Sequence, residues 1–567
     1  MDQTIRLDRI QGNVVPGFGA RHQAFLWLRF PDTRAARQWL GEVLPDVTSA
    51  GQVLAFKARR RGAGYEGGAP GGPRVTWANV AFTRPGLEIL GAPDIEAFST
   101  AFKEGLAARA EERLADRDPR RWLAGGRDAS GHALLILAGS ERDDLEAAIA
   151  VQRERLARYG VSDLLAQRLG GGTCRGETLP HRRWRQEHFG FRDGVSQPAL
   201  DGTDGTRPGD FILGYQDGDG GMTGQGPDWA REGSYLVFRR LRQDVFGFRQ
   251  ALHAAAEAAG LTPEQLGAKL VGRWKSGARL GERLEGWDPG FPAREAEARY
   301  AEEFAMDPEG ERIPRFAHVR KAYPRDIKGA GRHRLLRRGI PYGVPLDPDA
   351  TADDGVDRGL LFVSYQADIE TQFEHIQRRL NDRDFPGPAV GRDPLAGQPP
   401  NPHALELPEP GGKTSVLVHF GSHVAMTGGG YFFAPSIPAL AYLRDPTTAW
   451  EERQAVMADD RYRLGSFILD QNPYPWPITL PPAFDEAGSP HVFKAGLGKH
   501  VDQKSPFRVV DLAPDDPRYM QGLFWSLGGE RAYRMSKAVR IEYDYTYPDG
   551  STKTYSIIVG YEGGGGM

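Results

Sequence analysis

Three side chains of complementary chemistry stand in three separate short motifs of the sequence. Asp193 lies in a turn that Gly190 and Gly194 allow to be sharp. His318 follows a short apolar patch, and Arg337 ends another one. A carboxylate can carry a proton, an imidazole can bind a metal ion, and a guanidinium can stabilise negative charge as it develops. Brought together by a fold, the three would form a proton shuttle, a metal ligand and a charge stabiliser.

Each of these motifs also has an ordinary structural explanation. Asp-Gly turns are common, so Asp193 alone fits a solvated turn. His318 is one of 13 histidines and precedes a basic run, which also fits a surface loop. Arg337 and Arg338 on their own fit two surface cations. If another histidine binds the metal, the rival ligands are His188, His333 and His423.

The composition limits the classes of protein to which the chain can belong. With 72 basic and 75 acidic residues among 567, the net charge of −3 gives no basic field for nucleic acid. The single cysteine, Cys174, excludes internal disulfides, iron–sulfur clusters and zinc sites with several cysteines. No apolar run reaches the roughly 18 to 20 residues of a membrane span, and residues 1–9 do not resemble a leader. We therefore expect a cytoplasmic protein without a membrane span.

The pattern of apolar residues predicts an α+β protein with two halves, residues 1–200 and 201–445. Strand–helix–strand units in both halves predict two domains, each a sheet covered on one side by helices. The absence of a G-x-G-x-x-G motif with an acidic partner and of a G-K-[ST] loop argues against a nucleotide site. The strands are expected at 23–30, 75–82, 132–138, 234–241, 359–366 and 414–420.

Two further segments differ from these halves. Residues 276–315 are charged and poor in apolar periodicity, which predicts a surface insertion or lid in the second domain. Residues 446–567 are expected to form a β-rich extension. Within it, strands at 539–547 and 552–559 are joined by Pro548-Asp549-Gly550-Ser551, a strong signal for a hairpin turn.

Taken in order, the motifs resemble those of the dye-decolorizing (DyP-type) haem peroxidases over most of the first 445 residues. The resemblance rests on residues 189–198 around Asp193, 317–321 around His318 and 336–343 around Arg337. Gly339 stands where the compact bacterial members usually have Asn, so the chain is most similar to the longer members. Further signatures are Gln11-Gly12-Asn13, Ala81-Phe82-Thr83, 233–238 and 429–433.

The resemblance implies two ferredoxin-like domains, built of antiparallel sheets covered by helices, that hold haem b between them or in the second. It implies that Asp193 is the distal acid–base residue, that Arg337 is the distal charge stabiliser and that His318 is the proximal iron ligand. Asp393 is then a candidate partner for the second ring nitrogen of His318, since a ligating histidine commonly donates its other N–H to a carboxylate.

Three other residues are expected to complete the haem pocket. Arg320, two positions after His318, is the candidate for meeting the haem propionates. Leu360 and Phe362 share one face of the strand at 359–366, because side chains two positions apart point the same way along a strand. They are candidates for a dry wall above the haem.

The resemblance further implies that hydrogen peroxide is the oxidant and that bulky dyes, phenols and other aromatic compounds are the reducing substrates, with activity best in acidic solution. Substrates too large for the pocket would be oxidised at a surface Tyr or Trp. A homo-oligomer is compatible with the sequence. Two other functions remain open at this point: haem capture or iron release with little peroxidase turnover, and a haem-free interaction protein.

Overall fold

The computed structural model describes residues 5–446, except 63–73, 127–130, 181–184, 199, 201–204, 223, 281–303, 388–389, 399–402 and 409–414, together with three strands beyond residue 446. One compact unit comprises Arg9–Thr48 and Arg74–Arg444. The other comprises Met1–Asp8, Ser49–Pro73 and Asp445–Met567. The candidate site lies in the first of these units.

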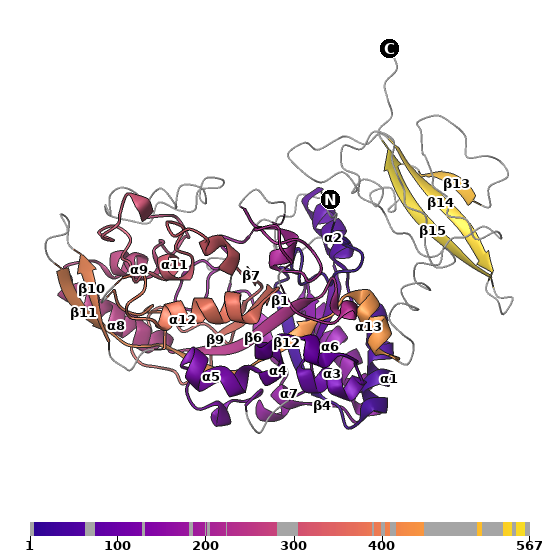
Figure 1. Cartoon of the computed structure of the whole chain (residues 1–567), viewed down its shortest axis with the longest axis horizontal. Coiled ribbons are helices and arrows are strands. Elements are labelled where there is room, and N and C mark those ends of the chain that lie inside the picture. The colour runs from indigo at the N-terminus through magenta and orange to yellow at the C-terminus, as the bar shows by residue number, and fades with distance from the viewer. Residues whose placement is uncertain are drawn as a thin grey trace, which may run out of the picture. The chain divides into compact units, whose positions relative to one another are not determined.

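The first unit is organised around one antiparallel sheet of ten strands (Figure 1). Its strand order is β4-β1-β3-β2-β12-β6-β9-β7, with β5 paired to β1 and β8 paired to β9. The N-terminal strands are β1 (His22–Arg29), β2 (Thr76–Phe82), β3 (Ala133–Gly139), β4 (Ser162–Asp163) and β5 (Cys174–Glu177). The others are β6 (Ser234–Gln243), β7 (Leu336–Arg337), β8 (Ile340–Tyr342), β9 (Gly359–Gln366) and β12 (Val424–Ala434).

The α+β class and the antiparallel sheets are as the sequence predicts. The two expected sheets are joined edge to edge, because Phe82 of β2 pairs with Phe433 of β12. The domain limits at 200 and 445 stay a prediction.

Helices pack on the sheet in both halves (Figure 1). Within the described residues, no helix is both long and apolar enough to cross a membrane. The helices of the N-terminal half are α1 (Thr33–Val43), α3 (Arg84–Leu90), α4 (Thr100–Glu104), α5 (Leu106–Leu114), α6 (Arg142–Arg158) and α7 (Leu164–Arg168). Those that follow are α8 (Val245–Ala258), α9 (Pro263–Val271), α11 (His318–Ala322), the π-helix η8 (Ile369–Glu374), α12 (His375–Asn381) and α13 (Ile437–Leu443). The other unit contains α2 (Ala50–Gly62).

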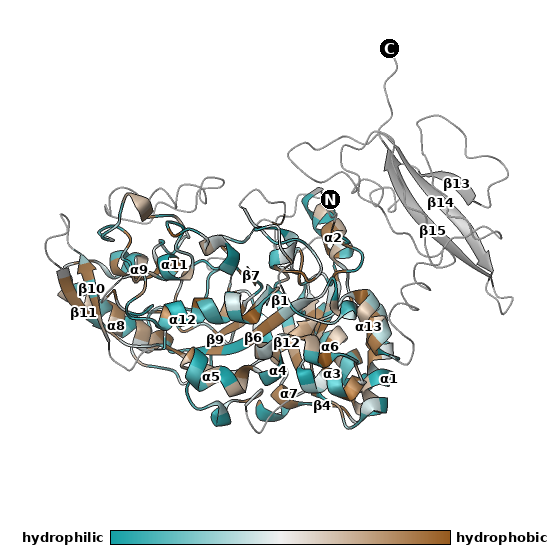
Figure 2. Cartoon of the chain, viewed as in Figure 1, coloured by the Kyte–Doolittle hydropathy of each residue, from teal (hydrophilic) through white to brown (hydrophobic). Residues whose placement is uncertain are grey.

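Local sequence explains these elements. β3 reads ALLILAG and is buried along its whole length, as expected for a strand covered on both faces. In α6, Leu145, Ile149 and Leu156 are buried at helical spacing, and two acidic residues in the first turn suit the positive end of the helix. Figure 2 shows the hydrophobic residues concentrated in the sheet, whereas the outer helices alternate between hydrophobic and hydrophilic positions.

Outside the ten-stranded sheet, the structure describes parts of three predicted segments. The strand expected at 414–420 is β11 (Ser415–Phe420), which pairs with β10 (His403–Pro408) in a two-stranded sheet of its own. Most of the expected insertion at 276–315 lies outside the described residues, but Leu280, Phe304 and Ile313 beside that part are buried in an apolar cluster. Beyond residue 446, β13 (Phe507–Leu512), β14 (Lys537–Thr546) and β15 (Thr552–Tyr561) form an antiparallel sheet. The expected turn at 548–551 is outside the described residues.

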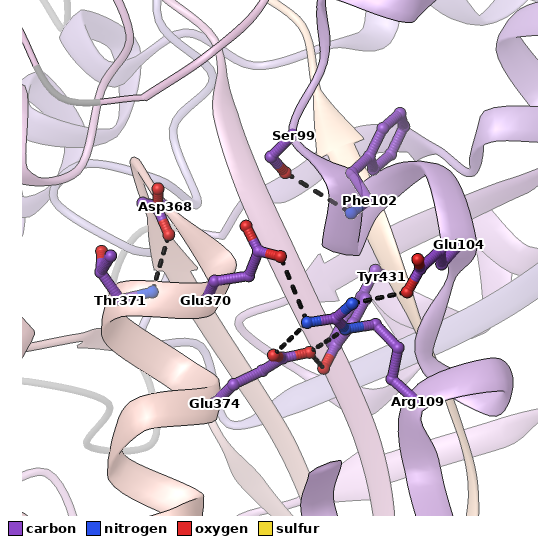
Figure 3. A network of polar contacts seen from close by, with 9 residues as sticks. All are labelled: Ser99, Phe102, Glu104, Arg109, Asp368, Glu370, Thr371, Glu374 and Tyr431. Carbon is purple, nitrogen blue, oxygen red and sulfur yellow. Dashed lines mark hydrogen bonds and ion pairs between the residues drawn. The ribbon is translucent and has the colours of Figure 1, made fainter. Parts of the chain in front are cut away.

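A polar network around the buried pair of Arg109 and Glu374 ties the two halves together (Figure 3). Arg109 of α5 binds both carboxylate oxygens of Glu374, at 2.6 and 2.7 Å. The other contacts of its guanidinium are with Glu104, at 2.5 Å, and Glu370, at 3.2 Å. Tyr431 of β12 donates its hydroxyl hydrogen to Glu374 over 2.9 Å. One arginine thus connects α5 to the π-helix, and Glu374 connects the π-helix to the sheet.

Candidate active site

A cavity of about 300 Å³ opens among the elements of the second half of the first unit. Its walls come from the segment 187–196, from strands β6 and β9, from helices α11 and α12, and from the residues around β7. Asp193, His318 and Arg337 all line it. The fold therefore brings together the three side chains that are up to 144 residues apart in sequence (337 − 193 = 144).

A short hairpin presents Asp193 to this cavity. The Asp193 amide donates to the carbonyl of Arg185 over 2.8 Å, and the Glu187 amide donates to the carbonyl of Phe191 over 2.9 Å. Gly190 at the tip has a φ of +95°, a conformation that a residue with a Cβ rarely adopts. The Glu187 carboxylate accepts the N–H groups of Phe189 and Phe191, each at 2.9 Å, and so holds the tip in place.

Arg337 is held to the same segment through its guanidinium and through its backbone. Its guanidinium donates to the carbonyl of Val195 over 2.6 Å. The side-chain amide of Gln197 accepts the N–H of Arg337 at 3.1 Å and donates to its carbonyl at 3.2 Å. Gln197 thus makes the pair of hydrogen bonds that a neighbouring strand would make at this edge of β7. Asp193 and Arg337 are therefore positioned by one shared segment.

His318 begins α11 and faces the cavity from another wall. Its Nδ1 donates to Oδ2 of Asp393 over 2.8 Å, and the Asp393 carboxylate is completely buried. The other carboxylate oxygen accepts the N–H groups of Leu395 and Ala396 at 2.8 and 2.7 Å. These contacts leave Nε2 of His318 as the ring nitrogen available to a ligand in the cavity.

Electrostatics favour the charged forms of this pair. Burial alone would lower the pKa of His318, but the charge of Asp393 and its hydrogen bond outweigh burial and raise it. Burial would raise the pKa of Asp393, but the charge and hydrogen bond of His318, with two backbone N–H groups, lower it. Asp393 is therefore an ionised acceptor that fixes the orientation of the imidazole.

The rival histidines lie elsewhere. Among the described residues that line the cavity, His318 is the only histidine. His188 has its Nε2 2.8 Å from the carbonyl of Tyr342, and His423 has its Nδ1 3.3 Å from Asp244. His333 stacks on His375 with 3.7 Å between the ring centroids.

Two family models match the segments that carry these residues. The model described as the DyP dimeric alpha+beta barrel domain matches residues 9–160, and that of the C-terminal part of Dyp-type peroxidases matches residues 185–390. The dye-decolorizing peroxidase msp1 of Mycetinis scorodonius is 30% identical over an alignment of 472 residues that covers 77% of this chain and 87% of that protein. The chain belongs to the dye-decolorizing peroxidase family.

Two other similar proteins extend this finding. The multifunctional dye peroxidase DyP2 of an Amycolatopsis species is 30% identical over an alignment of 478 residues that covers 77% of this chain and 95% of that protein. The structure of an ancestral D-type dye decolorizing peroxidase superposes with a TM-score of 0.65 at 31% identity, covering 77% of this chain and 99% of the other. The chain is thus a peroxidase, and its family depends on haem and uses hydrogen peroxide with reducing substrates.

The prediction for Arg320 does not fit the pocket of this peroxidase. The Arg320 side chain is 2% exposed and is not among the described residues that line the cavity. It donates instead to the carbonyls of Asp307 and Ile313, at 2.8 and 2.9 Å, and to that of Phe304, at 3.2 Å. Residues two apart on a helix do not share a face, so Arg320 points away from the side that His318 occupies. Its role is to hold the neighbouring loop.

Of the arginines that line the cavity, Arg273, Arg325 and Arg334 lie around Ser196, and the sequence analysis proposed none of the three. Arg273 and Arg325 donate to the Ser196 hydroxyl, at 3.1 and 2.8 Å, and Arg334 donates to the Ser196 carbonyl at 3.2 Å. The Tyr323 ring lies 4.3 Å from the Arg325 guanidinium and 4.9 Å from that of Arg334. They come from three separate segments, so no local motif could have identified them.

Leu360 and Phe362 lie where the sequence places them, on the cavity side of β9. The Phe362 ring is 6.1 Å from that of Phe373, which belongs to η8 and lines the cavity as well. This wall is apolar, so it can pack against a flat hydrophobic ring system and exclude water from it.

Proposed function

We propose that this peroxidase binds haem b in the described cavity, with His318 as the iron ligand, Asp193 as the proton carrier and Arg337 as the charge stabiliser. The observation that carries the proposal is the cavity itself, where a histidine backed by a buried carboxylate shares one space with a carboxylate and an arginine. Asp393 is the residue that orients His318 in this proposal.

The donor set suits haem. The Nε2 atom of His318 offers one nitrogen ligand, while Leu360 and Phe362 offer an apolar face. Haem also carries two carboxylates, and guanidinium groups are well suited to bind carboxylates. Arg325 and Arg334 are our candidates for that contact, in place of Arg320. When bound, haem would supply the iron centre that accepts the peroxide and stores its oxidising equivalents.

The chain's own residues then have distinct tasks. Asp193 takes a proton from one oxygen of hydrogen peroxide and returns it to the other oxygen, which leaves as water. Arg337 stabilises the negative charge that develops as the O–O bond breaks. Two molecules of reducing substrate then each give one electron, which balances the two-electron reduction of peroxide to water. Bulky dyes and phenols are the proposed donors, oxidised at the surface where they cannot enter.

Replacement of Asp193 by asparagine tests this assignment. An asparagine keeps the shape of the turn but cannot accept the peroxide proton, so the rate constant for reaction with hydrogen peroxide should fall about 10²- to 10⁴-fold. Haem binding should be unchanged. Asp349→Asn, at an exposed turn, is the matched control. A rate constant equal to that of the control would remove Asp193 from the mechanism, and full haem binding without measurable peroxide turnover would favour haem capture instead.

A further inference from the structure

Lys321 is a charged residue buried beside the candidate iron ligand. Its side chain is completely inaccessible to solvent. Its ammonium group donates to three backbone carbonyls, those of Asp382 at 2.5 Å and of Phe385 and Gly391 at 2.8 Å each. An ammonium group has three N–H donors, so this cage satisfies all of them.

The three carbonyls belong to the loop that presents Asp393. The loop is anchored to the end of α12 as well, since the Asp393 amide donates to the carbonyl of Leu380 over 2.9 Å. Lys321 and His318 are three residues apart on α11 and therefore lie on the same face of that helix. The short helix α11 is thus hydrogen-bonded to the loop at two places, through His318 to Asp393 and through the Lys321 ammonium to the three carbonyls.

The charge of Lys321 also acts on the hydrogen-bonded pair of His318 and Asp393. Among the described residues no carboxylate forms an ion pair with its ammonium group, so its charge is neutralised only by carbonyl dipoles and by carboxylates farther away. Burial lowers the pKa of Lys321 to about 8, and Asp393 is the carboxylate that most opposes this shift. In a buried setting such a charge is weakly screened.

We propose that Lys321 is a positioning residue for His318: it fixes the loop that carries Asp393 and its positive charge limits the electron donation that Asp393 confers on the imidazole. The inference rests on the proposed function, because it concerns His318 as the iron ligand. A more anionic partner makes an imidazole a stronger donor and stabilises ferric over ferrous iron. With the Lys321 charge present, the reduction potential of the bound haem would therefore be higher than with Asp393 present and the Lys321 charge removed.

The test is the ferric/ferrous potential of the full-length, haem-loaded protein at pH 6, where Lys321 is protonated. Lys321→Met removes the charge and the cage, Lys321→Gln removes the charge but retains two N–H donors, and Lys321→Arg retains the charge. Lys269→Met is the matched control, because Lys269 is also buried and donates to a carbonyl, that of Glu311 at 2.6 Å.

We expect the potential to fall in Lys321→Met and Lys321→Gln, to remain near the wild-type value in Lys321→Arg and Lys269→Met, and to rise in Asp393→Asn. In the Asp393→Asn background, Lys321→Gln should shift the potential much less, because the two residues act together. Equal potentials in Lys321→Gln and Lys321→Arg would overturn the proposed role of the Lys321 charge. A Lys321→Gln shift of the same size in the Asp393→Asn background as in the wild type would overturn it as well. Loss of haem binding in His318→Ala secures the proposed function separately, so a failure of the Lys321 role is distinguishable from a failure of the ligand assignment.

Discussion

Replacing Glu374 by glutamine is expected to destabilise the protein far more than the same change at Glu104, although both carboxylates bind Arg109. The Glu374 side chain is 3% exposed and binds the guanidinium with both oxygens, whereas the Glu104 side chain is 48% exposed and binds it with one (Figure 3). The variant Glu374→Gln leaves the arginine buried without its principal counter-charge.

The size of the effect follows from burial. Removing one partner of a buried ion pair costs about 3–5 kcal/mol, because the remaining charge stays desolvated. Glu104 and Glu370 still neutralise part of the Arg109 charge, and a glutamine oxygen can still accept the Tyr431 hydroxyl. We therefore expect about 3 kcal/mol for Glu374→Gln. An exposed pair contributes about 1 kcal/mol or less, which is the expectation for Glu104→Gln.

Urea denaturation followed by tryptophan fluorescence measures both values, provided that the two variants keep the wild-type dependence on denaturant. The free energies of unfolding should differ by about 2 kcal/mol between the variants. Equal free energies, or a loss below about 1 kcal/mol in Glu374→Gln, would refute the reasoning that burial decides the strength of this contact.

Three other predictions concern the pocket and the core. In Gln197→Met the backbone of Arg337 loses both amide contacts, so the rate constant with peroxide in stopped-flow should fall about 10- to 100-fold while the haem spectrum is retained; an unchanged rate constant would contradict this. In Arg325→Leu, haem should pass faster to a scavenging protein than in the wild type, and an equal transfer rate would exclude Arg325 as a carboxylate partner. Burial raises the pKa of Asp163 to about 6, so the folded state holds this proton more tightly than the unfolded state and loses stability as the pH rises through 4 to 6. Asp163→Asn should therefore stabilise by up to about 3 kcal/mol at pH 8 and not below pH 4, as chemical denaturation at the two pH values would reveal.

The sequence predicts those parts of the site that depend on local patterns. The turn around Asp193 and the alternation of Leu360 and Phe362 depend on neighbouring residues, and the structure places all three at the cavity. Asp393 stands 75 residues from His318, and it binds the imidazole Nδ1 as the sequence analysis expected. Arg320 lies outside the cavity lining because nearness in sequence does not decide which face of a helix a side chain occupies.

Long-range pairing explains what the sequence did not predict. The joining of the two sheets depends on β2 and β12, whose residues Phe82 and Phe433 are far apart in sequence and carry no signal for each other. The Ser196 arginines come from separate segments in the same way. Gln197 can bond to the Arg337 backbone because β7 is an edge strand of the sheet within the described part of the chain. The expected strand at 414–420 pairs with β10, the strand before it in the sequence, instead of joining the large sheet.

The most direct test of the central claim is the absorption spectrum of the full-length protein loaded with haem, compared between the wild type and His318→Ala. The account predicts a Soret band in the wild type that is lost or shifted in the variant, with His333→Ala, which removes a histidine outside the cavity, as the matched control that keeps the wild-type spectrum. A Soret band that is the same in His318→Ala and the wild type would contradict the assignment of His318 as the iron ligand.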